Sequence, residues 1–217
     1  MPFGLPNASC LGYPLPVPCA GHGGLGLRAA RRADADLLVA HLQALDPADR
    51  RMRFCATLGD EALARHVAGL WTRPTLVLAG FDGPIWGGPL HRPGPVRALA
   101  ELSLLGDEAE LGISVDPRLR RRGVGSYIVQ AAGALLAPRG VARIRACTLP
   151  GNTSFLRLVR GLGGDIEPGP DEIEVVLDVP ALARGYLRRR ATDIFRPAVP
   201  GAGIRGFPLV NTADIFK

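Results

Sequence analysis

The spacing of hydrophobic residues along this chain alternates between the period of a helix and that of a strand. Apolar residues at three- and four-residue spacing predict helices over 34–45, 61–70, 123–137 and 152–161. Shorter apolar or alternating runs predict strands over 24–29, 75–79, 96–104, 109–115, 141–148 and 172–178. Gly106-Asp107, between two of these strands, is a hairpin signal. The mixed order predicts an α/β fold.

Both ends of the chain differ in composition from this patterned segment. Residues 1–22 are rich in proline and glycine, which predicts a flexible leader and not a signal peptide. Residues 181–217 begin with a basic stretch and continue into a Pro/Gly-rich tail. We therefore expect one domain over 23–180. No apolar run approaches the ~20 residues that a membrane span needs, so we expect a cytoplasmic protein without a membrane partner.

Charge and cysteine usage narrow the classes of ligand. The formal net charge of +6 favours anionic ligands, and the basic residues gather at 118–122 and 184–190. No aromatic residues alternate with the second cluster, so we interpret it as a solvated helix end and do not expect nucleic-acid binding. The four cysteines lack close spacing, which predicts free thiols and no metal site.

One segment carries a binding pattern of its own. The strand that ends at Val115 is followed by an arginine-rich loop with two glycines and then by a helix. In such a turn, unpaired backbone N–H groups and the positive end of the helix dipole point to one place, and glycine lets an anion approach the backbone. We therefore predict a phosphate site at Arg120, Arg121, Arg122, Gly123, Val124, Gly125 and Ser126.

The spacing Arg120-x-x-Gly123-x-Gly125 resembles the R/Q-x-x-G-x-G/A signature of the GNAT superfamily, the acyl-CoA-dependent N-acyltransferases. AELGISVDP before the loop, and the helix, strand and Asn152 after it, resemble the family's core over about residues 25–180. The resemblance implies a mostly antiparallel, bent central sheet with helices on both faces. It also implies that acetyl-CoA is the co-substrate and that the loop holds its pyrophosphate.

The resemblance assigns further donor contacts. The strand before the loop would separate from its parallel neighbour and pair with the pantetheine arm through Ile113, Ser114 and Val115. A backbone N–H near Val115 would stabilise the oxyanion. Asn152 would reach coenzyme A, although a plain helix N-cap is an equally suitable role for asparagine.

The acid and base are less fully specified by the resemblance. A carboxylate on an otherwise apolar sheet is costly unless it is paired or used. We favour Glu110 as the base that deprotonates the amine, with Glu101 as the alternative; a solvent-facing strand position is the competing interpretation of each. The tyrosine that often follows the family's asparagine by seven residues is replaced here by Val159, so no acid is identified.

Two functions stay open on the sequence alone. The first is an N-acetyltransferase that moves an acetyl group to a primary amine, on a protein lysine, an N-terminus or a small molecule, by direct attack in a ternary complex. DPADRRMRF at 46–54 resembles a stretch of bacterial GNAT proteins that include protein lysine acetyltransferases. The second is an acetyl-CoA-binding sensor or interaction module, which Val159 would suit. A third and weaker option is an enzyme that acetylates RNA bound through residues 184–190. For the assembly, a homodimer is a further option.

Overall fold

The computed structural model describes residues 15–17, 25–83 and 93–194. Most of the predicted leader, the loop at 84–92 and the tail from 195 lie outside the described residues. The strands are β1 (Leu15–Val17), β2 (Leu25–Ala29), β3 (Thr75–Asp82), β4 (Val96–Leu105), β5 (Glu108–Val115), β6 (Arg143–Thr148), β7 (Asp165–Pro168) and β8 (Ile173–Asp178). The helices are α1 (Ala35–Gln43), α2 (Pro47–Phe54), α3 (Asp60–Gly69), α4 (Val124–Leu136), α5 (Thr153–Gly161) and α6 (Val179–Ile194).

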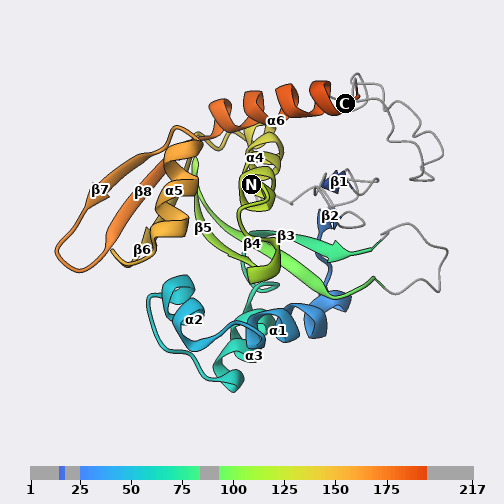
Figure 1. Ribbon diagram of the computed structural model, residues 1–217, viewed down its shortest axis with the longest axis vertical. Coiled ribbons are helices and arrows are strands. Elements are labelled where there is room, and N and C mark those ends of the chain that lie inside the picture. The colour runs from blue at the N-terminus through green and yellow to red at the C-terminus, as the bar shows by residue number, and fades with distance from the viewer. Residues whose placement is uncertain (1–14, 18–24, 84–92, 195–217) are drawn as a thin grey trace.

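The strands form one open sheet in the order β1-β2-β3-β4-β5-β6-β8-β7. Every neighbouring pair is antiparallel except β5 and β6, which are parallel. Helices α1, α2 and α3 lie on one side of the sheet, and α4 and α6 lie on the other (Figure 1). The α/β fold with a mostly antiparallel sheet and helices on both faces, predicted from the resemblance, is therefore confirmed.

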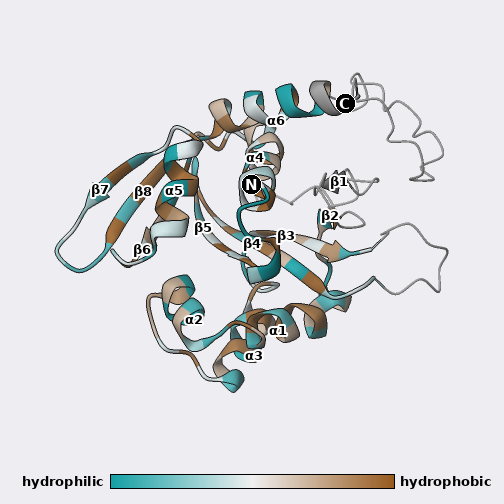
Figure 2. Ribbon diagram, viewed as in Figure 1, coloured by the Kyte–Doolittle hydropathy of each residue, from teal (hydrophilic) through white to brown (hydrophobic). Residues whose placement is uncertain are grey.

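Two hydrophobic cores fill the two sides of the sheet. Hydrophobic and hydrophilic residues alternate visibly along β7 and β8 (Figure 2), as the period of a strand requires. The core under α1 and α3 includes the fully buried Leu38, Leu42, Leu63 and Leu99. The larger core under α4 and α6 includes Leu102, Ile128, Leu136, Ile144 and Leu177. Burying the two faces separately fixes the register of each strand, because a one-residue slip would expose its apolar side chains.

The observed elements follow the predicted ones closely, but two strands were missed, β7 and β1. Strand β1 lies within the predicted flexible leader and is held there by antiparallel pairing with β2, so the leader prediction is wrong for Leu15–Val17. The predicted helices and strands are all present, with ends shifted by a few residues. Strand β7 was not predicted because it has only four residues, mostly exposed, and its single half-buried apolar side chain is Ile166. Its backbone pairs with β8, so tertiary pairing and not the hydrophobic pattern makes it a strand.

The basic stretch after residue 180 forms a helix that packs on the domain. Helix α6 carries Pro180 in its first turn, where the missing N–H removes no helical hydrogen bond. Leu182 is buried in the larger core, and the ring centroids of Tyr186 and Tyr127 lie 5.7 Å apart. The domain limits at 22 and 180 stay a prediction, but the described part of α6 lies directly against α4.

Candidate functional site

A cleft opens where β5 and β6 separate. The parallel pairing of these strands covers only Glu108 to Glu110 on β5, which faces Arg143 to Arg145 on β6. Beyond that point β5 continues to Val115 without a described strand partner on this side, and the space between the strands becomes a cleft of about 740 Å³. The splayed strand implied by the resemblance is therefore present.

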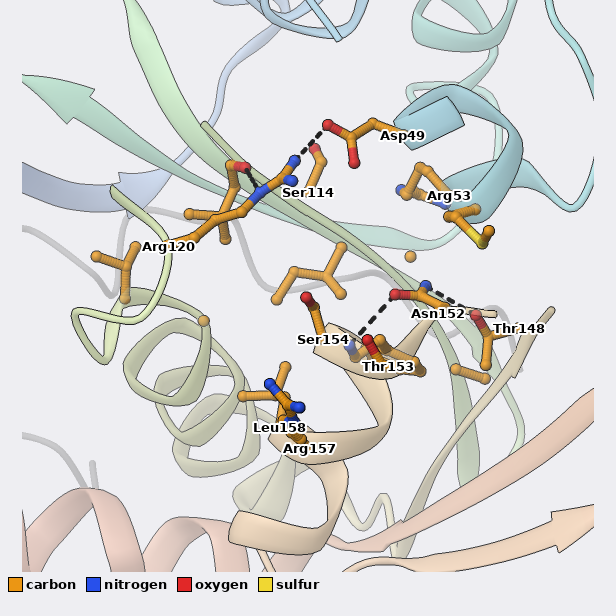
Figure 3. A pocket seen from close by; sticks show the side chains of 18 of the residues that line it. Asp49, Arg53, Ser114, Arg120, Thr148, Asn152, Thr153, Ser154, Arg157 and Leu158 are labelled. Atoms are coloured by element: carbon orange, nitrogen blue, oxygen red, sulfur yellow. Dashed lines mark hydrogen bonds and ion pairs between the residues drawn. The ribbon is translucent and has the colours of Figure 1, made fainter. Parts of the chain in front are cut away.

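The cleft brings together most of the predicted donor-binding residues. Those that line it are Ile113, Ser114, Val115, Arg120, Arg121, Gly123, Val124, Gly125, Ser126 and Asn152. Arg122 is exposed and does not line it. Figure 3 shows Asp49, Arg120 and Ser114 on one wall, with Asn152, Thr153 and Ser154 from the start of α5 on the opposite wall.

The loop from β5 to α4 has the geometry of an anion cradle. The chain leaves β5, makes a short turn at Pro117–Leu119 and reaches Gly123 with φ of 81°, a left-handed conformation that favours glycine. Helix α4 starts at the next residue, and its first turn faces the cleft at Val124, Gly125 and Ser126. A Cβ on Gly125 would lie 3.5 Å from Leu158, an ordinary contact distance. The free N–H groups of a helix N-terminus therefore point to the cleft.

Arg120 connects this loop to helix α2. Its Nη2 lies 2.5 Å from a carboxylate oxygen of Asp49, and its Nε donates to the Val115 carbonyl at 3.0 Å (Figure 3). The arginine that the signature places beside the phosphates thus also joins the end of β5 to α2. We call the part of the cleft formed by Leu45, Asp49, Met52 and Arg53 the helical wall.

Asn152 is the N-cap of α5 and also lines the cleft. Its side-chain oxygen accepts from the Phe155 N–H at 3.2 Å, and its amide donates to the Thr148 hydroxyl at 2.8 Å. The N-cap interpretation of Asn152 is therefore observed, while its contact with coenzyme A stays a prediction. Val159, at the position of the family's tyrosine, is fully buried in the larger core.

Glu101 is buried and paired with two side chains from the helices. Its Oε2 lies 2.7 Å from Nη2 of Arg53 and 2.7 Å from Nε2 of His66. Burial alone would raise the pKa of Glu101, but the Arg53 guanidinium and the His66 hydrogen bond outweigh it and hold the pKa below its ordinary value. Gly112 leaves room for this arrangement, because a Cβ there would overlap the Arg53 guanidinium.

Glu110 has the opposite environment. It is exposed and stands at the last paired position of β5 and β6, where the cleft begins. Burial, followed by the charges of Glu172, Glu174 and Glu110, raises the pKa of the Cys147 thiol, and Cys147 lines the cleft. The Glu110 carboxylate is therefore near enough to act electrostatically on Cys147, although neither Glu110 nor Glu101 is itself among the residues that line the cleft.

The structure also reveals a buried pair that sequence reasoning missed. The Val96 carbonyl accepts from Nδ1 of His41 at 3.1 Å, so Nε2, the other ring nitrogen, accepts from the Ser114 hydroxyl at 2.9 Å. Burial lowers the pKa of His41 to about 4, which keeps the ring neutral. The only sequence signal was a histidine in the apolar stripe of the first helix, which is usually a core position.

Among the described residues, no helix has the length and apolar composition to cross a membrane. The same residues contain no group of three or more histidine, cysteine or acidic side chains placed to hold a metal ion.

Part of the chain resembles known acetyltransferases in sequence, and a larger part resembles them in structure. The model of the acetyltransferase (GNAT) family matches residues 85–163, which include β4, β5, the loop, α4 and α5. No curated protein matched the sequence. The GNAT domain of S. lividans PAT superposes with a TM-score of 0.64 at 20% identity, covering 81% of this chain and 99% of that chain.

Other solved structures share the fold at lower similarity. The ribosomal-protein-S18-alanine N-acetyltransferase from Escherichia coli has a TM-score of 0.53 and 18% identity, covering 71% of this chain and 94% of its own. Spermidine N-acetyltransferase from Vibrio cholerae, solved with CoA and spermine, has a TM-score of 0.57 and 14% identity, covering 73% of this chain and 97% of its own.

The fold and the cleft together define the class of this protein: an open, mostly antiparallel sheet that is split beside a glycine-containing helix N-terminus. Residues 85–163 match the acetyltransferase (GNAT) family, and the chain has the fold of the GNAT structures to which it is similar.

Proposed function

We propose that this protein is an N-acetyltransferase that transfers the acetyl group of acetyl-CoA to a primary amine. The observation that carries the proposal is the split between β5 and β6 beside the Gly123–Gly125 loop. The split leaves a strand edge beside an anion cradle, and this combination suits a donor with an extended amide arm and a pyrophosphate.

The donor would be held mainly by backbone. The first-turn N–H groups of α4 would bind the pyrophosphate, with Arg121 at the wall of the cleft. The free edge of β5 would pair with the pantetheine amides, as an added strand does. The thioester carbonyl would then lie near Val115, where a backbone N–H would stabilise the tetrahedral oxyanion.

Glu110 is the better base of the two glutamates. An exposed carboxylate at the cleft entrance is free to accept a proton from an ammonium group, directly or through water. Glu101 is held by Arg53 and His66, which lowers its basicity and ties both partners to the core. The deprotonated amine would attack the thioester carbon, the C–S bond would break, and the thiolate would leave.

The departing thiolate needs no buried acid. Val159 lies in the core and has no proton to give. The Ser154 hydroxyl points into the cleft from the first turn of α5 (Figure 3) and would be the protein's proton donor in its place. Water is the alternative donor, and a thiol is acidic enough to leave without a dedicated acid.

The acceptor class is narrowed by the chemistry of the cleft entrance. Of the carboxylates that act on the Cys147 thiol, Glu174 is paired with Arg145, whereas Glu110 and Glu172 are exposed and take part in no ion pair of the described residues. These two carboxylates would favour a cationic acceptor near Cys147. The Escherichia coli relative is named for an alanine of a ribosomal protein and the Vibrio cholerae relative for spermidine. Both kinds of acceptor are amines, and we propose the same group here.

Calorimetric titration of acetyl-CoA tests the donor site. We expect binding by the wild type and by Gly125→Ala, since a Cβ at this position makes only ordinary contacts. Gly125→Glu would place a carboxylate beside the phosphates, and we expect its Kd to rise at least about 100-fold. No binding by the wild type would overturn the proposal. Binding without thiol release in the presence of a broad amine panel would favour the sensor alternative, which the apolar Val159 suits.

A further inference from the structure

Helix α6 runs antiparallel to α4 and in close contact with it. Three contacts follow one another along the pair. A Cβ on Gly133 would overlap the Cβ of Leu182. One turn nearer the start of α4, a Cβ on Gly185 would press on Nε2 of Gln130. Nearer still, the Tyr127 and Tyr186 rings meet edge to face. The α6 turn after Tyr186 therefore lies at the start of α4, beside the phosphate loop.

Arg189 extends from this turn to the loop. Its Nη1 lies 3.9 Å from the position that a Cβ would occupy on Gly123. Arg189 is exposed, and no ion pair in the described part of the chain includes it. Figure 2 shows hydrophilic residues along the C-terminal half of α6, the half of the helix to which residue 189 belongs. A guanidinium without an ion-pair partner among the described residues therefore lies beside the loop, and Arg189 is not one of the residues that line the cleft.

The position of Arg189 suggests which phosphate it serves. The pyrophosphate of a bound donor would use the N–H groups of the loop, and Arg121 already lines the cleft beside them. Coenzyme A carries one more phosphate, on the 3′ position of its ribose, at the nucleotide end of the molecule. Because a guanidinium binds phosphate through two parallel hydrogen bonds, one arginine at the outer side of the loop is sufficient for it.

We propose that Arg189 binds the ribose 3′-phosphate of the acyl-CoA, so that α6 makes the enzyme selective for the phosphorylated nucleotide. The inference rests on the proposed function, since it presumes that the loop binds coenzyme A. It assigns a role to a helix that begins 16 residues beyond the segment matched by the family model. It also gives part of the basic stretch at 184–190 a ligand other than nucleic acid.

The test compares acetyl-CoA with acetyl-3′-dephospho-CoA by calorimetry, using wild type, Arg189→Gln and Arg184→Gln. Arg184 is the matched control, because it is an exposed arginine on the same helix. We expect the wild type to bind acetyl-CoA about tenfold more tightly than the dephospho donor. Arg189→Gln should lose that preference by weakening only acetyl-CoA binding, while Arg184→Gln keeps it. Thermal unfolding of all three proteins checks that the helix remains folded.

The outcomes separate this inference from the proposed function. Equal weakening of both donors by Arg189→Gln would mean that Arg189 does not read the 3′-phosphate, and would overturn the inference while leaving the donor site intact. An unchanged preference in Arg189→Gln would overturn it in the same way. A wild type that binds neither donor would overturn the proposed function itself.

Discussion

Two parts of the cleft lining, the donor side and the helical wall, are built in different ways. The donor side comes from one continuous stretch, 113–126, and depends mainly on the course of the backbone. The helical wall and the side chains behind it come from distant parts of the chain, since Arg53 and His66 reach Glu101 across 48 and 35 residues. A site built from local backbone is specified by its own residues, whereas a site built from side chains depends on the whole fold.

The donor side and the helical wall also differ in what neutralises their charges. The loop carries backbone donors and arginines that an anionic ligand would neutralise. Glu101 and Arg53 neutralise each other away from water, so their charges are costly to separate. We therefore expect mutations in the helical wall to affect stability first, and mutations in the loop to affect binding first. Three predictions test this difference, beginning with the largest effect.

Removing the cation beside Glu101 should have the largest effect on stability. Arg53→Met leaves a buried carboxylate with His66 as its only described partner, and we expect the free energy of unfolding to fall by about 3–5 kcal/mol. Urea unfolding measures this loss. Arg51→Met, an exposed position on the same helix, is the control and should change stability by less than about 0.5 kcal/mol.

The same variant tests whether the donor side and the helical wall are independent. Acetyl-CoA binding by folded Arg53→Met should stay within about twofold of wild type, since the loop does not depend on this pair. A loss of donor affinity comparable to that of Gly125→Glu would show that the helical wall shapes the donor site, and the contrast drawn above would not hold.

The buried His41 should make the free energy of unfolding depend on pH, at pH values above those at which the carboxylates titrate. Burial lowers its pKa from 6.5 to about 4 in the folded protein, so the unfolded chain binds the proton more readily between these values. The stabilisation that comes from the neutral His41 ring is therefore complete above pH 6.5 and is lost as the pH falls toward 4. This loss lowers the free energy of unfolding by up to roughly 3 kcal/mol. Unfolding at a series of pH values measures this.

The window from pH 6.5 to about 4.5 isolates the histidine. Glu101 and Asp34, whose folded pKa values are lowered, have ordinary values of 4.5 and 3.8 and lose their contributions below that window. His41→Gln should therefore flatten the pH dependence within it. A slope that persists in His41→Gln would assign the effect to other groups.

The two glutamates should separate activity from stability. Glu110→Gln removes the proposed base from an exposed position, so we expect kcat to fall about 100-fold with an unchanged unfolding midpoint. Glu101→Gln, the matched variant, should lower the midpoint because it removes the charge that Arg53 and His66 face. Turnover by thiol release and urea unfolding give the two readouts. Unchanged turnover in Glu110→Gln would contradict its assignment as the base.

Particular residues show how far the sequence could predict the site. The loop residues Gly123 and Gly125 were found because strand, loop and helix N-terminus are consecutive in the chain. The pairing of Arg120 with Asp49 was not predictable, because nothing local brings α2 to the loop. The same applies to the hydrogen bond of His41 with Ser114, which joins residues 73 positions apart.

The role of α6 shows the same limit. The basic character of 184–190 was plain in the sequence, but the pattern gave no reason to place it at the phosphate loop. The small residues Gly133 and Gly185 decide that placement by letting α4 and α6 approach closely, and small size is not itself a signal of contact. Arg189 reaches Gly123 only as a result of that packing.

The sequence by itself determined the order of elements, the anion-binding loop and the GNAT resemblance, because hydrophobic period and turn chemistry are properties of neighbouring residues. Only the tertiary structure decided that Glu101 is locked by Arg53 and His66 while Glu110 stays exposed at the split of the sheet. Both are glutamates on adjacent strands, and their difference lies in what the distant helices place beside them. Burial and charge pairing are set by the fold as a whole, so two similar residues acquire different chemistry.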